Sequence, residues 1–229
     1  MLAFIAAERR ELEGLLEHAE EIRHPDWPLD FVRMGRLHGR DIVAAANGPG
    51  PGLAGRAADA AKEYLGMGMD GLVSVGFCGA LNPAFRVGAI FVAAEVLGVG
   101  PVLAPASARP YQSGRLLSVD RVVSTASERA ELHSHGADAV EMEASAVGTR
   151  AAQWKIPFYA VRVVTDTADE NFPLDFNRVR DAQGRFSRAK ILAAAALRPA
   201  TLLPELWKLN RRSKCAAKAL GDFLADARF

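Results

Sequence analysis

The sequence contains few cysteines and no long apolar run. Cys78 and Cys215 are the two cysteines among 229 residues, and their separation matches no metal-ligand spacing. A disulfide framework is therefore not expected, and we expect a reducing, cytoplasmic location. No run of about 18 apolar residues occurs, so no transmembrane helix is predicted. The N-terminus begins apolar, but charges start at Glu8, too early for the core of a signal peptide.

An excess of charge of one sign is also absent. The 28 Lys and Arg residues nearly balance the 27 Asp and Glu residues, which gives a formal net charge of +1. No broad basic field predicts nucleic-acid binding. Half of the residues are hydrophobic, which is typical of a globular protein, and no internal repeat or linker is visible. The length predicts a single domain over residues 1–229.

Apolar runs alternate with helical periodicities along most of the chain. Strands are predicted for "LAFIAA", "GLVSVGFCGAL", "VGAIFVAAEVLG", "RLLSVDRVV" and "IPFYAVRVVTD", and helices for "ERRELEGLLEHAEE", "RAADAAKEYLG", "SERAELHSHG" and "EASAVGTRAAQWK". The stretch "LDFVRMGRLHGRDIVAAAN" predicts a β-hairpin with its turn at His38 and Gly39. This alternation indicates a three-layer α/β/α sandwich around a central mixed, largely parallel sheet.

Two segments depart from this alternation. From Gly98 to Gly114, Pro, Gly and Ser occur without periodicity, so a surface loop is expected. The tail over about residues 187–229 is predicted to be helical, with breaks at Pro199 and Pro204. In parallel sheets, ligands bind at the carboxyl ends of the strands. Functional residues are therefore expected directly after the predicted strands.

Two carboxylates flank one methionine in "AVEMEASAV". Glu141 and Glu143 lie two residues apart, so a regular helix would not point both side chains the same way. At a junction from strand to helix, one carboxylate can point into a cleft and accept hydrogen bonds from paired hydroxyls, such as those of a ribose. The alternative is that both acids simply favour the first turn of a helix.

A third carboxyl group ends a buried strand in "AVRVVTDTADENF". Asp166 lies beside apolar residues, where burial can raise the pKa of the carboxyl group enough for it to donate a proton. The alternative is a turn or helix cap, a position in which Asp is common. Glu8 and Glu11 follow the first strand, and read alone they fit best on a solvated helix face.

Glycines and one cysteine mark two further strand ends. Gly48 and Gly50 in "NGPGPGLAG" can present backbone N–H groups to an anion, although the loop has neither the lysine of a P-loop nor "GxGxxG" spacing. A plain tight turn fits equally well. Cys78 lies among apolar residues and glycines with no histidine placed beside it, which favours a small buried side chain over a catalytic thiol.

Together these segments resemble the nucleoside phosphorylase and nucleosidase superfamily. "NGPGPG", "VSVGFCGALNPAFRVGAIFVA", "AVEMEASAV" and "PFYAVRVVTDTAD" occur in the family's order within residues 1–170. The chain is most similar to the methylthioadenosine/S-adenosylhomocysteine nucleosidase branch. Its tail is similar to the hopanoid-associated phosphorylases, which are implicated in releasing adenine from adenosylhopane. The resemblance implies an enzyme that cleaves the N-glycosidic bond of a 5′-substituted purine nucleoside.

The resemblance also assigns roles to the candidate residues. Glu143 would bind the ribose 2′- and 3′-hydroxyls, with Met142 against the sugar and Glu141 lining the same pocket. Asp166 falls where the family has the general acid that protonates the leaving purine at N7. The other positions implied are Phe77, Cys78, Gly79, Val122 and Arg162 for substrate binding, and Gly48 and Gly50 for the anion loop.

Water activation and phosphate binding concern a second group of residues. The water-activating acid of the nucleosidases falls on Glu11, or on Glu8 if the local alignment shifts. Nucleosidases carry a serine at the position of Phe77. Bacterial purine phosphorylases carry a phosphate-binding serine there and an arginine at the position of Ser74. Hydrolysis is therefore favoured; the alternatives are phosphorolysis, with phosphate as co-substrate bound in another way, and a nucleoside-binding protein without turnover.

Three expectations about partners complete the interpretation. The chemistry requires no metal or organic cofactor, and the resemblance implies a homo-oligomer, most simply a dimer. The C-terminal helices contain Trp207 beside Lys208 and a basic "NRRSK" run. They are expected to pack on the core. The alternative is that their apolar faces border the 5′ side of the pocket and contact a bilayer, with Arg211, Arg212 and Lys214 at anionic headgroups.

Overall fold

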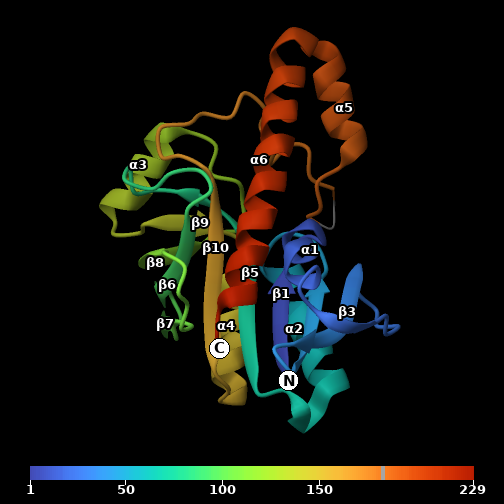
Figure 1. Cartoon of the computed structure of the whole chain (residues 1–229). Coiled ribbons are helices and arrows are strands. Elements are labelled where there is room, and N and C mark those ends of the chain that lie inside the picture. Colours follow the sequence, from blue (N-terminus) through green and yellow to red (C-terminus); the bar gives the residue numbers. More distant parts are fainter. Residues whose placement is uncertain (182–183) are drawn as a thin grey trace.

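A mixed sheet runs through the centre of the protein (Figure 1). The structure is a computed structural model that describes residues 1–181 and 184–229. The strands are β1 (Leu2–Ala6), β2 (Glu20–Arg23), β3 (Phe31–Leu37), β4 (Arg40–Ala46), β5 (Gly71–Ala80), β6 (Ile90–Val96), β7 (Gly100–Pro101), β8 (Gln112–Ser118), β9 (Ala139–Glu141) and β10 (Phe158–Asp166). Their order is β10-β6-β8-β9-β5-β1-β4-β3-β2, with β7 on β6. β10 also pairs with β5, so five of the strands close into a ring.

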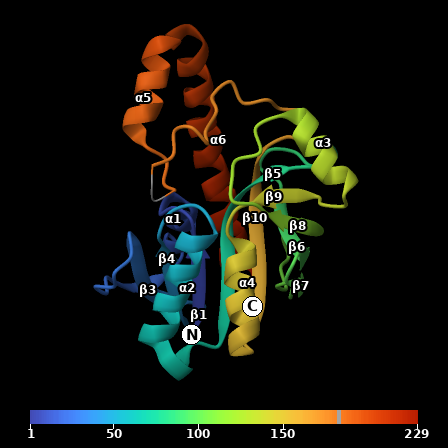
Figure 2. The same ribbon diagram turned by 180° about the vertical axis from the view of Figure 1, so that it is seen from behind.

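Helices cover both faces of this sheet. They are α1 (Arg10–Leu16), α2 (Pro51–Leu65), α3 (Ala126–Ser134), α4 (Ala144–Trp154), α5 (Arg188–Leu197) and α6 (Pro199–Asp226), with the single turn η1 (Gly66–Gly68). α1 and α6 pack together on one face, and α2 and α4 pack together on the other (Figures 1 and 2). The predicted three-layer α/β/α sandwich is confirmed.

Strand β1 illustrates how the sheet is buried on both faces. All five of its side chains are buried. Because successive side chains of a strand point to opposite faces, Ala3 and Ile5 join the apolar core under α2 and α4, whereas Leu2 and Phe4 join the core under α1 and α6. A strand buried on both faces has a continuous apolar sequence, which is the pattern seen in "LAFIAA".

Of two predicted connections between strands, one is confirmed and one is not. β3 and β4 form the expected hairpin, and His38 and Gly39 make its turn with left-handed φ values of 52° and 76°. The prediction of a plain loop from Gly98 to Gly114 is wrong. Gly98, with φ of 85°, turns the chain so that β7 can pair with β6, and β8 begins before the segment ends.

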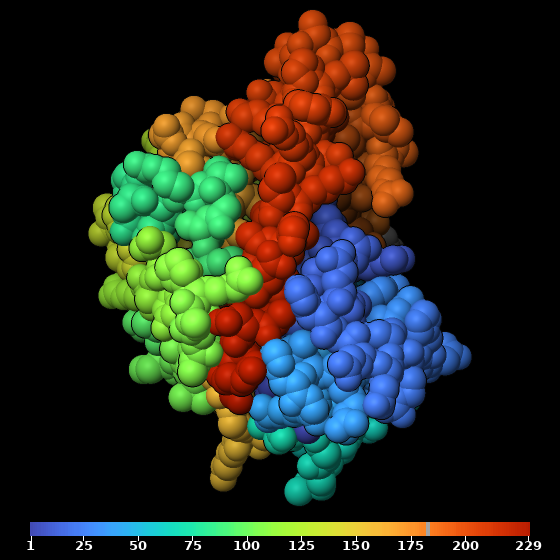
Figure 3. All heavy atoms as spheres, viewed as in Figure 1, coloured from blue at the N-terminus to red at the C-terminus, as the bar shows by residue number. Residues whose placement is uncertain are grey.

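The tail folds into two antiparallel helical segments that stand out from the sheet (Figures 1 and 3). Residues 187–214 are called the α5–α6 hairpin below. α5 ends before Pro199 and α6 begins at it, so the first predicted break is confirmed. The second is wrong, since α6 continues through Pro204. Proline removes the hydrogen bond to the carbonyl four residues earlier, and that residue, Ala200, is exposed to water.

Helix α6 spans 28 residues and reaches from the hairpin back to α1. At the crossing, a Cβ on Gly14 would lie 2.8 Å from the carbonyl oxygen of Ala217 and 3.0 Å from the Cα of Gly221. The two glycines therefore allow the helix backbones to touch. Among the described residues, neither α6 nor any other helix combines the length and apolar character needed to cross a membrane.

Candidate active site

A cavity of about 1200 Å³ lies between the carboxyl ends of β1, β4, β5 and β10 and the α5–α6 hairpin. β1 pairs in parallel with β4 and with β5, and β10 pairs in parallel with β5. The carboxyl ends of all four strands therefore meet at one edge of the sheet. The predicted site residues that line the cavity are Glu8, Glu11, Gly48, Phe77, Cys78, Gly79, Val122, Glu141, Met142, Glu143 and Asp166. The residues after the strands are thus brought together as expected. Gly50 and Arg162 lie outside the lining.

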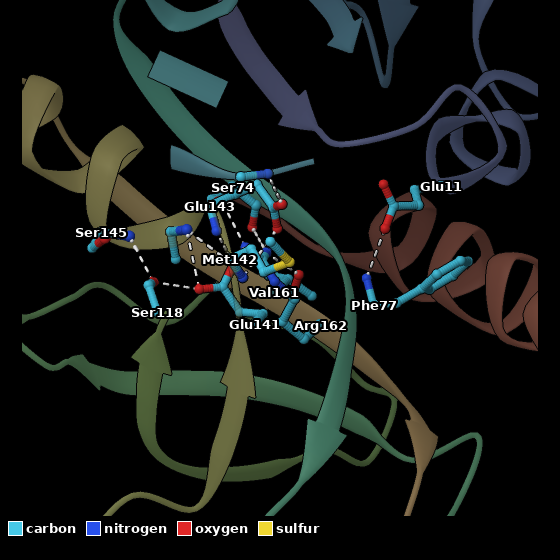
Figure 4. A network of polar contacts seen from close by, with 12 residues as sticks. Glu11, Ser74, Phe77, Ser118, Glu141, Met142, Glu143, Ser145, Val161 and Arg162 are labelled. Carbon is cyan, nitrogen blue, oxygen red and sulfur yellow. Dashed lines mark hydrogen bonds and ion pairs between the residues drawn. The ribbon is translucent and has the colours of Figure 1, made fainter. Parts of the chain in front are cut away.

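Glu143 is placed on the cavity by the junction between β9 and α4 (Figure 4). Its Oε1 accepts a hydrogen bond from the N–H of Gly50 at 2.7 Å, and its Oε2 accepts one from the N–H of Met142 at 3.3 Å. Burial raises the pKa of Glu143 to about 8, and the negative charge of Glu141 adds to the rise. Each carboxylate oxygen retains a second lone pair, so Glu143 can also accept hydrogen bonds from ligand hydroxyls.

The glycine loop does not offer the anion site that its sequence suggests. The N–H of Gly50 is already bonded to Glu143, and the N–H of Gly48 donates to the carbonyl of Ala7 at 2.8 Å. Gly50 has a φ of 99°, a conformation that favours glycine and aims its N–H at the carboxylate. The loop therefore holds Glu143, and in this structure both N–H groups that were predicted to bind an anion already have partners within the chain.

Glu141 forms a buried ion pair beneath the cavity. Its Oε2 lies 2.5 Å from the Nη2 of Arg162, and it also accepts hydrogen bonds from the N–H groups of Glu143 and Ala144, each at 2.9 Å. The hydroxyl of Ser118 donates to its other oxygen. These contacts fix the start of α4 and hence the position of Glu143. Arg162 is fully buried, so it supports the site from behind rather than touching the cavity.

Glu11 is the acid on the opposite side of the network (Figure 4). Its Oε1 accepts a hydrogen bond from the N–H of Phe77 at 2.9 Å, and its Oε2 accepts one from the N–H of Glu8 at 2.7 Å. Burial raises the pKa of Glu11 to about 7, and the charge of Glu8 adds to the rise. Glu8 itself forms a surface ion pair with Arg10. Of the two acids, Glu11 is therefore the one held inside the site.

Asp166, at the end of β10, pairs with a residue that the sequence interpretation missed. Its Oδ2 lies 2.5 Å from the Nη2 of Arg129 in α3, and its Oδ1 accepts a hydrogen bond from the hydroxyl of Thr165 at 2.7 Å. Burial raises the pKa of Asp166, and the guanidinium of Arg129 opposes that rise. Arg129 is 1% exposed and is held further by the carbonyls of Ala80 and Val123.

Gly79 makes room for this ion pair. A Cβ at Gly79 would lie 2.6 Å from both the Nη1 of Arg129 and the Oδ2 of Asp166. Gly79 therefore shapes the pocket through its missing side chain. No local pattern in "SERAELHSHG" distinguishes Arg129 from an arginine on a solvated helix face, so its role depends on where α3 packs.

Three other predicted residues occupy different parts of the cavity. The ring of Phe77 lies under the guanidinium of Arg10, 5.6 Å from its centre. Cys78 is 3% exposed, and burial raises the pKa of its thiol, in agreement with a small buried side chain. The backbone of Val122 exchanges two hydrogen bonds with the side chain of Asn177, at 2.8 and 2.9 Å.

The side of the cavity next to the hairpin carries apolar side chains, in agreement with the expectation that the apolar faces of the tail border the pocket, together with the polar Arg188, Asn210, Arg212 and Ser213. The apolar wall, as it is called below, consists of Phe172, Phe176, Phe186, Ile191, Leu206 and Leu209. These residues come from α5, α6 and the segment that leads from β10 to them. The cavity therefore combines carboxyl groups at the sheet with six apolar side chains on the side of the hairpin.

This arrangement suits acid–base chemistry on a polar molecule with an apolar extension. Glu11 can accept a proton near neutral pH, and Asp166 is a buried carboxyl group with a raised pKa. Glu143, on the same cavity, can bind hydroxyls. Paired carboxyl groups of this kind cleave glycosidic bonds by protonating a leaving group and activating water.

Solved structures share the fold of this chain. The 5′-methylthioadenosine/S-adenosylhomocysteine nucleosidase of Neisseria meningitidis in complex with methylthio-immucillin-A is 22% identical, with a TM-score of 0.71 over 98% of this chain and 96% of that one. The corresponding Campylobacter jejuni nucleosidase is 16% identical, with a TM-score of 0.70 and the same coverage. Futalosine hydrolase of Helicobacter pylori strain 26695 is 16% identical, with a TM-score of 0.67 over 97% and 94%.

The sequence itself also matches a known family. The family model described as "Phosphorylase superfamily" matches residues 2–105 and 101–198. The match spans most of the sheet, including every strand that contributes to the cavity, and it reaches into the α5–α6 hairpin. The chain therefore belongs to the phosphorylase superfamily, and it is an enzyme of the class that cleaves N-glycosidic bonds.

Proposed function

We propose that the protein hydrolyses the N-glycosidic bond of a 5′-substituted purine nucleoside and releases the purine, most simply adenine. The proposal rests on Glu11, a buried carboxylate held by the N–H of Phe77 on the same cavity as Asp166 and Glu143. With a pKa raised to about 7, Glu11 is suited to take a proton from water near neutral pH. The likeness to two nucleosidase structures supports the same reaction class.

In this mechanism each acid has one task. As the bond from the sugar C1′ to the base breaks, its electron pair leaves with the base, and Asp166 donates a proton to N7. Glu143 accepts hydrogen bonds from the ribose hydroxyls and stabilises positive charge that develops on the sugar. Glu11 takes a proton from the water whose oxygen bonds to C1′, and proton transfers of this kind contribute about 10²–10⁴-fold each.

Two residues at the expected phosphate positions favour water over phosphate. Ser74 is fully buried, and its hydroxyl accepts a hydrogen bond from Arg162 at 2.7 Å. Phe77 contributes an apolar ring where a phosphate-binding hydroxyl is expected. A phosphate placed here would also meet the carboxylate of Glu11, whose negative charge repels it.

Product analysis tests this choice. The purified protein is incubated with 5′-methylthioadenosine, S-adenosylhomocysteine, futalosine and 5′-alkylthioadenosines, with and without phosphate. We expect free base and free sugar at a rate that phosphate does not change. Base release that requires phosphate and yields a sugar 1-phosphate would assign phosphorolysis instead.

The apolar wall favours a nucleoside with a large apolar 5′ substituent. Six apolar side chains line the side of the cavity away from the sheet, and burial of apolar surface contributes about 25 cal/mol per Å². We therefore expect kcat/KM to rise as the alkyl chain of a 5′-alkylthioadenosine lengthens. Adenosylhopane is an extreme member of this class and is included because of the tail's resemblance. Preference for methylthioadenosine over every longer substrate would contradict this assignment.

A nucleoside-binding protein without turnover is the second candidate function. Phe77 favours it, since the resembling nucleosidases carry a serine at that position. Equilibrium dialysis with radiolabelled nucleosides, combined with a search for free base, separates the two functions. Binding without release of base from any nucleoside would establish the second function.

Two finer points belong to the same proposal. We propose a homodimer, for which light scattering during size-exclusion chromatography would give twice the 24.5 kDa of one chain. We also propose that no metal takes part, so that dialysis against a chelator leaves the rate unchanged.

A further inference from the structure

The outer surface of the α5–α6 hairpin exposes large apolar side chains. Leu192 is 66% exposed, Leu197 84%, Leu203 54% and Trp207 65%. The inner surface of the same helices is packed, since Ala195 and Leu202 belong to a small apolar core of their own. The helices therefore carry both packed and exposed apolar side chains. The packed ones hold the hairpin together, whereas the exposed ones have no role in that packing. The hairpin as a whole projects from the body of the molecule (Figure 3).

The hairpin also concentrates positive charge. Residues 187–214 contain seven Lys or Arg residues and one acid, Glu205, for a net charge of +6. The whole chain carries +1, so the remaining residues carry −5. None of the ion pairs in the described part of the chain involves Arg198 or Arg211. The guanidinium of Arg211 lies over the ring of Trp207, 5.8 Å from its centre.

We propose that the outer surface of the α5–α6 hairpin docks on a lipid bilayer that contains anionic lipids. Exposed leucines can enter the acyl boundary, tryptophan favours the interface, and cations beside them attract anionic headgroups. A second copy of the chain is the other obvious occupant. Contact between two such hairpins would place their cations, such as Arg198 and Arg211, against each other, whereas anionic headgroups complement them, so charge favours the bilayer over pairing of two hairpins.

Docking would give the cavity a membrane-facing side. Ile191 of α5 and Leu206 and Leu209 of α6 belong to the apolar wall, whereas Leu203 and Trp207 of the same α6 turns are exposed. The same helices therefore contact both the cavity and the proposed bilayer. An amphiphilic nucleoside could place its polar head at the carboxyl groups and its 5′ substituent along the helices. This access route rests on the proposed function, whereas the docking itself does not.

Vesicle co-sedimentation tests the docking. The full-length protein is mixed with vesicles of about three parts phosphatidylcholine to one part phosphatidylglycerol, or with phosphatidylcholine alone. We expect binding to the anionic vesicles that weakens at least about tenfold between 0.1 M and 0.5 M salt. Trp207 should be quenched by brominated lipid, and the variant Trp207→Phe should lose that quenching.

Matched variants separate the hairpin from other exposed side chains. Leu197→Asp with Leu203→Asp, and Arg198→Glu with Arg211→Glu, should each reduce vesicle binding about tenfold or more. The controls are Met67→Asp, at an apolar residue 96% exposed on η1, and Arg56→Glu, at an exposed arginine on α2. Neither control should change binding, and all four should cleave a water-soluble nucleoside at the wild-type rate.

Two results would overturn the docking proposal. One is no binding to anionic vesicles, or binding that the control variants reduce as much as the hairpin variants. The other is a dimer in light scattering that the hairpin variants dissociate, because the outer surface would then be covered by a second copy. Neither result affects the release of base, so failure of the docking proposal is distinguishable from failure of the proposed function.

Discussion

Asp166 and Glu143 perform different steps of the proposed reaction, so their substitution should have different effects. Asp166→Asn removes the proton donor and should lower kcat by about 10²–10⁴-fold with little change in KM. Glu143→Gln should raise KM as well as lower kcat, because its hydrogen bonds to the ribose exist before the transition state. Steady-state kinetics with one nucleoside checks both. Small and equal effects would show that the two roles are wrongly assigned.

Arg129 is a positioning residue for Asp166. Without its guanidinium, Asp166 would keep the hydrogen bond from Thr165 but lose its opposing charge, so burial would raise its pKa further. Arg129→Met should therefore move the alkaline fall of kcat to higher pH and lower kcat on the order of tenfold or more. Arg129→Lys keeps the charge and should move the fall less.

A buried pair with one partner removed costs about 3–5 kcal/mol, so the Arg129→Met variant must be shown to be folded by circular dichroism. The pH profile of Arg129→Lys provides a second measurement if Arg129→Met does not fold. A loss of kcat with an unchanged pH profile in both variants would leave Arg129 with a purely structural role.

Sequence reasoning found the acids of the site but not their partners. Glu11 follows a predicted strand and Asp166 ends one, and parallel strand ends meet at one edge of a sheet whatever the details of packing. Glu143 is identified by its paired-carboxylate motif at the start of a predicted helix. Arg129 reaches Asp166 only because α3 packs over the end of β5. The packing of α3 on β5 is a tertiary contact, and the local sequence of α3 does not predict it.

At the scale of the elements, the crossing of α1 and α6 depends on two glycines. Gly221→Ala would place a Cβ against the backbone of Gly14 and should destabilise the protein by about 1–3 kcal/mol. Since α1 carries Glu11, kcat should fall too. Gly52→Ala is the matched control, because a Cβ there meets nothing within 4 Å. Chemical unfolding measures the difference, and equal stability of the two variants would contradict the close packing.

Most of the elements were predictable from the sequence, and two of the errors share one cause. The hairpin of β3 and β4 and the helices α2, α3 and α4 follow from local signals. Two of the errors, at β7 and at Pro204, occur where the environment overrides a local preference. β7 forms because β10 pairs only with Ile90–Val92 of β6, which leaves Glu95 and Val96 to pair with β7. α6 passes Pro204 at a place where Ala200, four residues earlier, is exposed to water. The strands β2 and β9 were also missed, and β2 begins inside the predicted helix "ERRELEGLLEHAEE", of which α1 forms only Arg10–Leu16.

At the scale of the whole molecule, the buried acids make stability depend on pH. The pKa of Glu143 rises from 4.5 to about 8, and that of Glu11 rises from 4.5 to about 7. Between these values the folded protein binds more protons than the unfolded chain, so these two groups make stability fall as pH rises. The melting temperature of the ligand-free protein should therefore be lower at pH 8 than at pH 5.

Glu143→Gln should reduce this fall, since an amide does not titrate. The comparison is made by differential scanning fluorimetry in buffers of equal ionic strength. A melting temperature that falls equally in the variant and the wild type would show that Glu143 does not titrate in this range.

The length of α6 and its contact with α1 have a mechanical consequence. Twenty-eight residues at about 1.5 Å each make a rod of about 42 Å. One end of the rod carries Leu203 and Trp207, and near the other Gly221 touches Gly14 backbone to backbone, with no side chain between them to absorb movement. The contact between α6 and α1 thus lies about one helical turn from Glu11. We therefore expect a displacement of the outer end of α6 to shift α1 and, with it, the carboxylate that is proposed to activate water.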